Sequence, residues 1–189
     1  MTDPDELRWE TLEREVSHRC EAFEVFTDEV RLPDGSTARF DFVREPPSAV
    51  VLGFTPGREA VVLREYRHAV GRVALGLPGG SAEAADTDMA ETAARELREE
   101  AGYAAGGLEP LLVAEPANGL LDSVRHYFVA RDCEPIADPD RDLDESIVVE
   151  TMPYDALRER VLAGRVRDER TVTAVAVYEG VTPASPEGS

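Results

Sequence analysis

The chain has 189 residues, which is enough for one well-buried domain and little more. It carries 39 acidic residues against 20 basic ones, for a net charge of −19, and it contains no lysine. This balance argues against binding to a nucleic-acid backbone, which requires positive charge, and against anionic membrane surfaces. An acidic, lysine-free composition is typical of a cytosolic protein from a high-salt organism, where salt screens the mutual repulsion.

The cysteines and the N-terminus give no sign of export or membrane insertion. Cys20 and Cys133 have neither a disulfide framework nor metal-ligand spacing, and we expect both to be buried free thiols. Residues 1–6 are acidic, the reverse of a signal peptide, and no apolar stretch approaches the ~20 residues that a membrane span requires. The sequence therefore predicts a soluble, cytoplasmic protein.

The first third of the chain is predicted to be one short helix followed by strands. The helix is expected over residues 4–15. Apolar alternation predicts strands over 23–32 and 37–43, joined by a hairpin turn at Pro33-Asp34-Gly35. Two further apolar strands are expected over residues 49–54 and 60–67.

A turn and a helix are predicted next. Leu77-Pro78-Gly79-Gly80 is a turn-prone stretch suited to close backbone approach. Asp88 and Glu91 resemble a capping box at the start of a helix, and Gly102 is suited to its end. One face of this helix carries an apolar i, i+4 stripe of Met89, Ala93, Leu97 and Ala101.

The rest of the chain is predicted to add strands and two helices. Strands are expected over 108–114, 124–130 and 147–150, with an Asp- and Pro-rich loop over 131–144. One helix is predicted over 153–163, with Pro at its first position and Gly164 after its end, and another over 168–178, closed by Gly180. Many strands with few helices predict an α+β fold, a mixed sheet between helices. We expect three segments: an N-terminal helix and hairpin over 1–45, a catalytic domain over 46–180 and a frayed tail over 181–189.

Three carboxylates crowd the last turns of the helix that ends before Gly102. At about 100° per residue, Glu96, Glu99 and Glu100 fall within an arc of roughly 100°. They repel one another and face the negative end of the helix dipole. A hard divalent cation with oxygen ligands would compensate both effects, although a solvated acidic helix face is the alternative interpretation.

Gly80 together with Arg95-Glu96-Leu97-Arg98-Glu99-Glu100-Ala101-Gly102-Tyr103 resembles the Nudix box, Gly-x5-Glu-x7-Arg-Glu-U-x-Glu-Glu-x-Gly-U, where U is apolar. The first half departs from the pattern, because its Glu position falls on Asp86 counting from Gly80 and on Thr87 counting back from Arg95. A one-residue insertion explains both counts. Glu65-Tyr66-Arg67, the turn before Gly80, the segment with Trp9 and the Pro-Asp-Gly hairpin are similar to the ADP-ribose and ADP-sugar pyrophosphatase branch.

The resemblance implies a Nudix-type α/β/α sandwich with a mixed β-sheet and a loop–helix–loop motif. It implies metal-dependent hydrolysis of the pyrophosphate bond of a small nucleotide-sugar substrate. The favoured substrate is ADP-ribose, which would be cleaved to AMP and ribose 5-phosphate. Another ADP- or GDP-sugar, a dinucleotide or a nucleoside triphosphate is the alternative within enzymes. A catalytically silent nucleotide-sugar-binding module is the alternative outside them. The branch also implies a homodimer built with the N-terminal strands.

The resemblance also assigns the metal ligands and the arginine of the motif. Glu96 and Glu100 are expected to bind Mg²⁺, or Mn²⁺ in its place, with Glu99 bound directly or through water. The carbonyl of Gly79 is expected to complete the coordination. Arg95 is expected to pair with a motif glutamate and fix its rotamer.

Substrate contacts and a general base are expected from other segments. Arg67 is expected to approach the substrate phosphates, with a structural ion pair as the alternative, and Gly80 to lie beside the substrate. The turn Glu115-Pro116-Ala117-Asn118-Gly119 takes the place of a family substrate turn, so Asn118 and Gly119 are expected to bind substrate. The base is expected to be Glu145, with Asp144 and Asp142 as alternatives.

Overall fold

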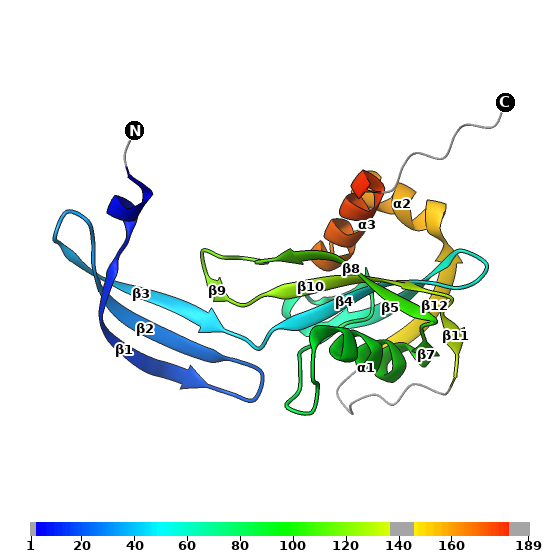
Figure 1. Ribbon diagram of the computed structural model, residues 1–189, viewed down its shortest axis with the longest axis horizontal. Coiled ribbons are helices and arrows are strands. Elements are labelled where there is room, and N and C mark those ends of the chain that lie inside the picture. The colour runs from blue at the N-terminus through cyan, green and yellow to red at the C-terminus, as the bar shows by residue number, and fades with distance from the viewer. Residues whose placement is uncertain (1–2, 137–145, 182–189) are drawn as a thin grey trace. The chain divides into compact units, whose positions relative to one another are not determined.

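The computed structural model describes residues 3–136 and 146–181, and the chain divides into two compact units (Figure 1). The first, which we call the N-terminal unit, consists of Met1–Pro47 and Glu115–Val124. The second, which we call the sandwich unit, consists of Ser48–Ala114 and Arg125–Ser189. The N-terminal unit thus takes in a ten-residue stretch from much later in the chain.

The N-terminal unit is a twisted four-stranded sheet in the order β1-β2-β3-β9. The strands β1, β2 and β3 are antiparallel neighbours, and β9 adds to β3 in the parallel direction. The hairpin between β2 and β3 turns at Gly35, which adopts a φ of +84°, so the predicted Pro-Asp-Gly turn is confirmed. The elements are η1 (Pro4–Leu7), β1 (Glu10–Arg19), β2 (Glu24–Arg31), β3 (Thr37–Arg44) and β9 (Leu121–Asp122).

The predicted helix over residues 4–15 is wrong. Only a single 3-10 turn, η1, forms, and β1 follows it. Cross-strand ion pairs connect β1 to β2. One of them is bidentate, from Arg14 to Asp28, with N–O distances of 2.8 and 2.7 Å. Tertiary pairing of this kind overrides the weak helical pattern of the segment.

The sandwich unit is built on a six-stranded mixed sheet. Five strands follow the order β12-β5-β4-β10-β8, and β6 pairs with β5 beside them. Strands β4 and β10 run parallel, and the other pairs are antiparallel. The strands are β4 (Ser48–Phe54), β5 (Glu59–Arg67), β6 (Arg72–Gly76), β8 (Gly107–Ala114), β10 (Arg125–Arg131) and β12 (Ile147–Pro153), and a separate small pair joins β7 (Tyr103–Ala104) to β11 (Glu134–Pro135).

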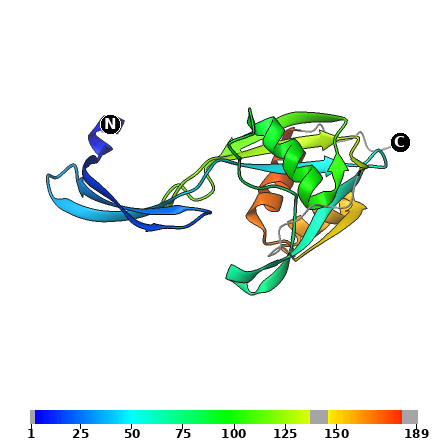
Figure 2. The ribbon, with the colours of Figure 1, turned by 90° about the horizontal axis from the view of Figure 1, so that it is seen from below.

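Helices cover both faces of this sheet (Figures 1 and 2). Helix α1 (Met89–Ala101) lies on one face, and α2 (Tyr154–Leu162) and α3 (Glu169–Val181) lie on the other. Strand β4 shows why two cores form: Ala49 and Val51 pack on the α1 side, whereas Val50, Leu52 and Phe54 pack on the α2 and α3 side. The predicted α+β sandwich is therefore confirmed.

Several local predictions differ from the structure. Pro153 caps α2 and its first helical residue is Tyr154, while Gly180 lies inside α3 rather than ending it. Cys133 is a buried free thiol as expected, but Cys20 is exposed. Within residues 3–136 and 146–181, no helix combines the length and apolar character needed to cross a bilayer.

Candidate active site

Helix α1 is fixed at both ends by its own sequence. The Asp88 carboxylate accepts hydrogen bonds from the backbone N–H groups of Ala90 and Glu91, both at 2.9 Å. Glu91 accepts from the backbone N–H and the hydroxyl of Thr87, so its expected structural role is confirmed. Gly102 ends the helix in the left-handed region, at a φ of +75°. The motif helix therefore has a defined start and stop.

Packing of α1 turns its carboxylates inward at one end of the sandwich unit. Ala93, Leu97 and Ala101 are buried against the sheet. The same seating leaves Glu96 and Glu100 only 8% exposed each. Burying two carboxylates is costly unless hydrogen bonds or positive charges compensate it.

The turn before α1 brings its backbone against these carboxylates. The backbone N–H of Gly79 donates to Glu100 Oε2 at 2.7 Å. Gly79 has a φ of +154°, and a Cβ there would lie 2.2 Å from the carbonyl oxygen of Ala49. A Cβ on Gly80 would lie 2.6 Å from Glu96 Oε1. Glycine is favoured at both positions for different reasons: a side chain at position 79 would clash with the Ala49 backbone, and one at position 80 would clash with the Glu96 carboxylate.

We expect Gly79→Ala and Gly80→Ala to separate stability from activity. Gly79→Ala should lower the free energy of unfolding by a few kcal/mol, because its methyl meets rigid backbone. Gly80→Ala should cost little stability, because the Glu96 side chain can move, yet it should reduce turnover by displacing that carboxylate. Urea unfolding and initial rates on the two variants measure both effects. Equal destabilisation by both would contradict this distinction.

Arg95 lies among the carboxylates and holds them in place. Its guanidinium contacts Glu96 Oε1 at 2.8 Å and Glu99 Oε2 at 2.9 Å, and it donates to the carbonyl of Ser81 at 2.8 Å. Burial lowers the pKa of Arg95, but the hydrogen bonds to Asp86 and Glu99 outweigh it and raise that pKa above its ordinary value. Arg95 is thus a fixed cation that orients two motif carboxylates.

Asp86 holds the other side of Arg95. It accepts from Arg95 Nη2 at 3.1 Å, from the Thr92 hydroxyl at 2.9 Å and from the backbone N–H of Glu83 at 2.9 Å. The hydrogen bond from Arg95, with the backbone bond from Glu83, lowers the pKa of Asp86 to about 2. Of the two positions that the altered motif leaves open, Asp86 therefore lies beside the arginine.

We expect Asp86 to contribute pH-dependent stability. Its folded-state pKa is about 2, below the ordinary 3.8, so its contribution is complete above pH ~4 and is lost as the pH falls toward ~2. The difference in free energy of unfolding between the wild type and Asp86→Asn should therefore shrink over that range. Urea titrations at pH 6, 4, 3 and 2 measure it. A difference that stays constant down to pH 2 would rule out this role.

Two further arginines lie at the Gly79 turn. Arg170, at the start of α3, donates to the Gly79 carbonyl at 3.3 Å and pairs with Asp168 at 3.4 Å. Arg67, at the end of β5, pairs with Glu65 at 2.7 Å. Burial and the nearby Arg170 lower the pKa of Arg67, while Glu65 and Glu100 act against this shift. Two guanidinium groups thus stand next to the buried carboxylates, and no motif or spacing pointed to Arg170.

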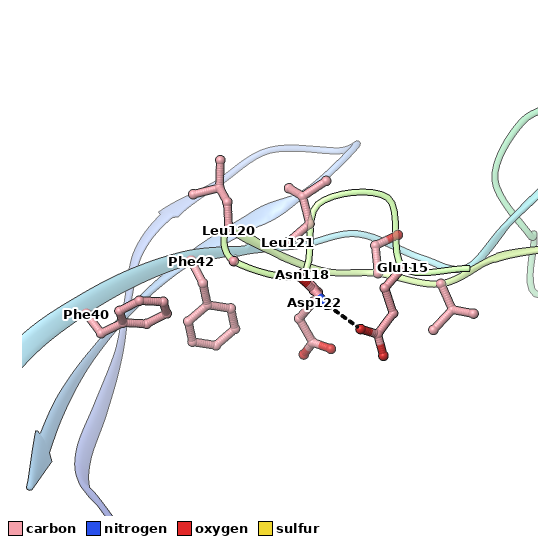
Figure 3. Close-up of a pocket in the computed structure, with 10 residues that line it drawn as sticks. Phe40, Phe42, Glu115, Asn118, Leu120, Leu121 and Asp122 are labelled. Carbon is pink, nitrogen blue, oxygen red and sulfur yellow. Dashed lines mark hydrogen bonds between the residues drawn. The ribbon is translucent and has the colours of Figure 1, made fainter. Parts of the chain in front are cut away.

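Other residues predicted for the site belong to the N-terminal unit or fall outside the described residues. Asn118 and Gly119 belong to the N-terminal unit, where they line a hollow of about 310 Å³ together with Phe40 and Phe42 (Figure 3). Asn118 donates to Glu115 Oε2 at 3.1 Å there. The predicted bases Glu145, Asp144 and Asp142 fall outside the described residues.

The motif carboxylates are hard oxygen donors of the type that Mg²⁺ prefers. In the described part of the chain, however, no three His, Cys, Asp or Glu side chains converge as a ready-made metal site. Arg95 draws Glu96 and Glu99 to itself, and Gly79 holds Glu100. The donor chemistry fits a divalent cation, while the carboxylates are held by protein groups. Carboxylates beside two arginines suit a ligand that carries phosphates together with a cation.

Comparison with known proteins identifies relatives over most of the chain. The NUDIX domain model matches residues 44–175. The ADP-ribose pyrophosphatase of Bacillus subtilis (strain 168) is 28% identical over 172 residues, covering 89% of this chain and 91% of that protein. A CMP-5'-(N-acetyl-N-hydroxy-3-aminopropyl)phosphonate hydrolase of Streptomyces rubellomurinus (strain ATCC 31215) is 30% identical over 177 residues, covering 93% and 84%. A solved structure titled as an ADP compounds hydrolase shares the fold, with a TM-score of 0.79 at 20% identity over 92% of this chain and 93% of the other.

Proposed function

This chain belongs to the Nudix family and is a Nudix hydrolase, and we propose that it cleaves the pyrophosphate bond of ADP-ribose to give AMP and ribose 5-phosphate. The observation that carries the proposal is the Gly79 turn. Its N–H donates to the buried carboxylate of Glu100, and its carbonyl accepts from Arg170. A diphosphate bound there would meet arginine on one side and motif carboxylates on the other.

Nudix hydrolases generally use divalent metal ions, and we propose Mg²⁺ for this one, with Mn²⁺ as a substitute. Glu96, Glu99 and Glu100 with the Gly79 carbonyl would hold it. When bound, the cation would neutralise phosphate charge and polarise a water molecule. Three contacts would have to change for these ligands to face the cation, because Arg95 binds both Glu96 and Glu99, and Arg170 binds the Gly79 carbonyl.

The protein's own groups have distinct roles in this proposal. Arg67 and Arg170 would bind the substrate phosphates, since guanidinium matches phosphate oxygens in pairs. Arg95 would orient the motif glutamates, and Gly80 would leave room beside Glu96. Glu145, with Asp144 and Asp142 as alternatives, would accept the proton of the attacking water. Asn118 and Gly119, in the N-terminal unit, stay predicted substrate contacts.

We also propose a homodimer that uses the N-terminal unit. This unit exposes large apolar side chains on and beside its sheet: Trp9 is 51% exposed, Val16 45% and Phe40 37%. Trp9 and Phe40 are in contact, with ring centroids 5.7 Å apart, and an exposed apolar patch of this kind is typical of an association surface. A mass near twice 20.7 kDa in light scattering would support the dimer, and a monomeric mass at all concentrations would exclude it.

The substrate is tested by a panel of nucleotides assayed with Mg²⁺ at high salt. It should include ADP-ribose, an ADP-sugar, a GDP-sugar, a dinucleotide, ATP and a CMP-linked phosphonate, because one relative is named for that last class. AMP and ribose 5-phosphate formed fastest from ADP-ribose would support the proposal. Faster turnover of another compound in the panel would identify that compound, and not ADP-ribose, as the substrate. Binding without turnover of any member would favour a silent binding module.

A further inference from the structure

A basic hollow lies in the sandwich unit, away from the motif helix. It has a volume of about 280 Å³ and is lined by β5, β6, the end of α2 and the segment before α3. Five arginines line it together with three apolar residues: Arg64, Arg72, Arg160, Arg165, Arg167, Val73, Leu75 and Val166. In a chain with 39 acidic residues and 20 basic ones, such a concentration of one sign is unexpected.

Alternation along β5 places this hollow on the opposite face of the sheet from α1. Val61 and Leu63 pack in the core beneath α1, whereas Val62 packs with α2 and α3. Arg64 follows the alternation of Val62 and therefore lies on the α2 and α3 face. The hollow is thus separated from Glu96 and Glu100 by the sheet itself.

Most of the arginines in the hollow lack a carboxylate partner. Arg64 pairs with Glu150 at 2.7 Å. Across the described residues, Arg72, Arg160, Arg165 and Arg167 form no ion pair within 4.0 Å, whereas every other described arginine except Arg58 does. Apart from Arg58, the described arginines without an ion pair therefore gather in one place.

Local structure does not explain this gathering. The negative end of the α2 dipole favours one cation, Arg160, in the last turn. The segment beyond it is fixed by Val166, which is buried in the core, so Arg165 and Arg167 on either side of it stand exposed at the hollow. Guanidinium groups held close together repel one another, and a bound anion removes that repulsion.

We propose that this hollow is a binding site for a small phosphate-bearing anion, distinct from the Nudix motif. Several guanidinium groups around one volume match the oxygens of a phosphate monoester or diphosphate, each through paired N–H donors. The apolar floor of Val73, Leu75 and Val166 suits a compact organic group attached to the phosphate, such as a sugar. The hollow also provides the local positive potential that a phosphate needs near a protein of net charge −19. This inference stands whichever nucleotide the enzyme hydrolyses.

The test is calorimetric binding to the whole protein without divalent metal. Inorganic phosphate, pyrophosphate, ribose 5-phosphate and AMP are titrated separately, at the lowest salt at which the protein stays folded. Inorganic phosphate binding as tightly as the esters would identify the free ion as the ligand, and tighter binding of an ester would identify an organic phosphate. Binding of any of the four supports the proposal once the variants below locate it in the hollow, and no binding of any of the four would overturn it.

Variants then locate the binding. Arg165→Gln and Arg167→Gln alter exposed side chains without ion pairs, and Arg58→Gln is the matched control, because Arg58 is also exposed and unpaired. Each hollow variant should raise the Kd roughly ten-fold, the loss expected for one charged hydrogen-bonding group, and the control should leave it unchanged. Unchanged affinity in both hollow variants, with loss in Arg170→Gln, would place the phosphate at the Gly79 turn and overturn the proposal.

Discussion

Glu100→Gln should remove nearly all hydrolysis while leaving the protein folded. The Glu100 carboxylate accepts from the Gly79 N–H at 2.7 Å, and the oxygen of a glutamine can still accept that bond. The substitution therefore keeps the link between α1 and the turn but removes the negative charge that a hard cation requires. A positioned metal contributes several kcal/mol to catalysis, so turnover should fall roughly 10³-fold or more.

Stability should respond in the opposite direction to activity. Glu96 and Glu100 are one turn apart on α1 and both are buried, so removing one charge relieves repulsion in the metal-free protein. The free energy of unfolding should stay level or rise. Urea unfolding without metal measures the stability of the variant. Electron paramagnetic resonance of bound Mn²⁺ measures its metal affinity, and initial rates measure its turnover. Glu159→Gln, at an exposed position of α2, is the control. Full turnover of Glu100→Gln at saturating Mg²⁺ would mean that other groups hold the metal.

The sandwich could be predicted because its signals are local and periodic. Strand β4 alternates between two cores, and α1 carries an apolar stripe between a capping aspartate and a terminal glycine. The residue pattern of each segment therefore predicts both its secondary structure and the face that it buries. Where the pattern was weak, the prediction was wrong. Residues 10–19 form β1 because they pair with β2, with ion pairs such as Arg14 to Asp28 between the strands. These partners are distant in the sequence, so no local window of residues could reveal them.

The motif residues could be found from spacing, but their partners could not. The contacts of Asp86 depend on the conformation of a loop, and those of Arg170 depend on how α3 packs on the sheet. Neither can be predicted from the spacing of residues in the sequence. The insertion after Gly80 left two candidate positions for the upstream Glu of the motif, and only the fold shows Asp86 at Arg95 and Thr87 at the helix cap. The same holds for the five arginines of the hollow, which come from four separate segments. Long-range convergence of charge has no signature in a single sequence.

The second large effect should be a dependence of folding on salt. At a net charge of −19, the carboxylates of the folded protein repel one another, and salt weakens this because the screening length falls from about 10 Å at 0.1 M to about 3 Å at 1 M. We expect the thermal midpoint to rise by about 5–10 °C between ~0.1 M and ~2 M KCl, which corresponds to a gain of a few kcal/mol. Differential scanning calorimetry over that range measures the shift. A rise of this size would support the expectation, drawn from composition, that the protein is adapted to high salt.

A pH control separates screening from other effects of salt. Near pH 4.5, the isoelectric point of the sequence, the net charge vanishes and with it most of the repulsion that salt relieves. The shift in midpoint should therefore be several times smaller at pH 4.5 than at pH 7. A general strengthening of apolar burial by salt would instead raise the midpoint equally at both pH values. An equal shift would assign the effect to burial, and a flat midpoint at pH 7 would remove the inference that this composition is an adaptation to salt.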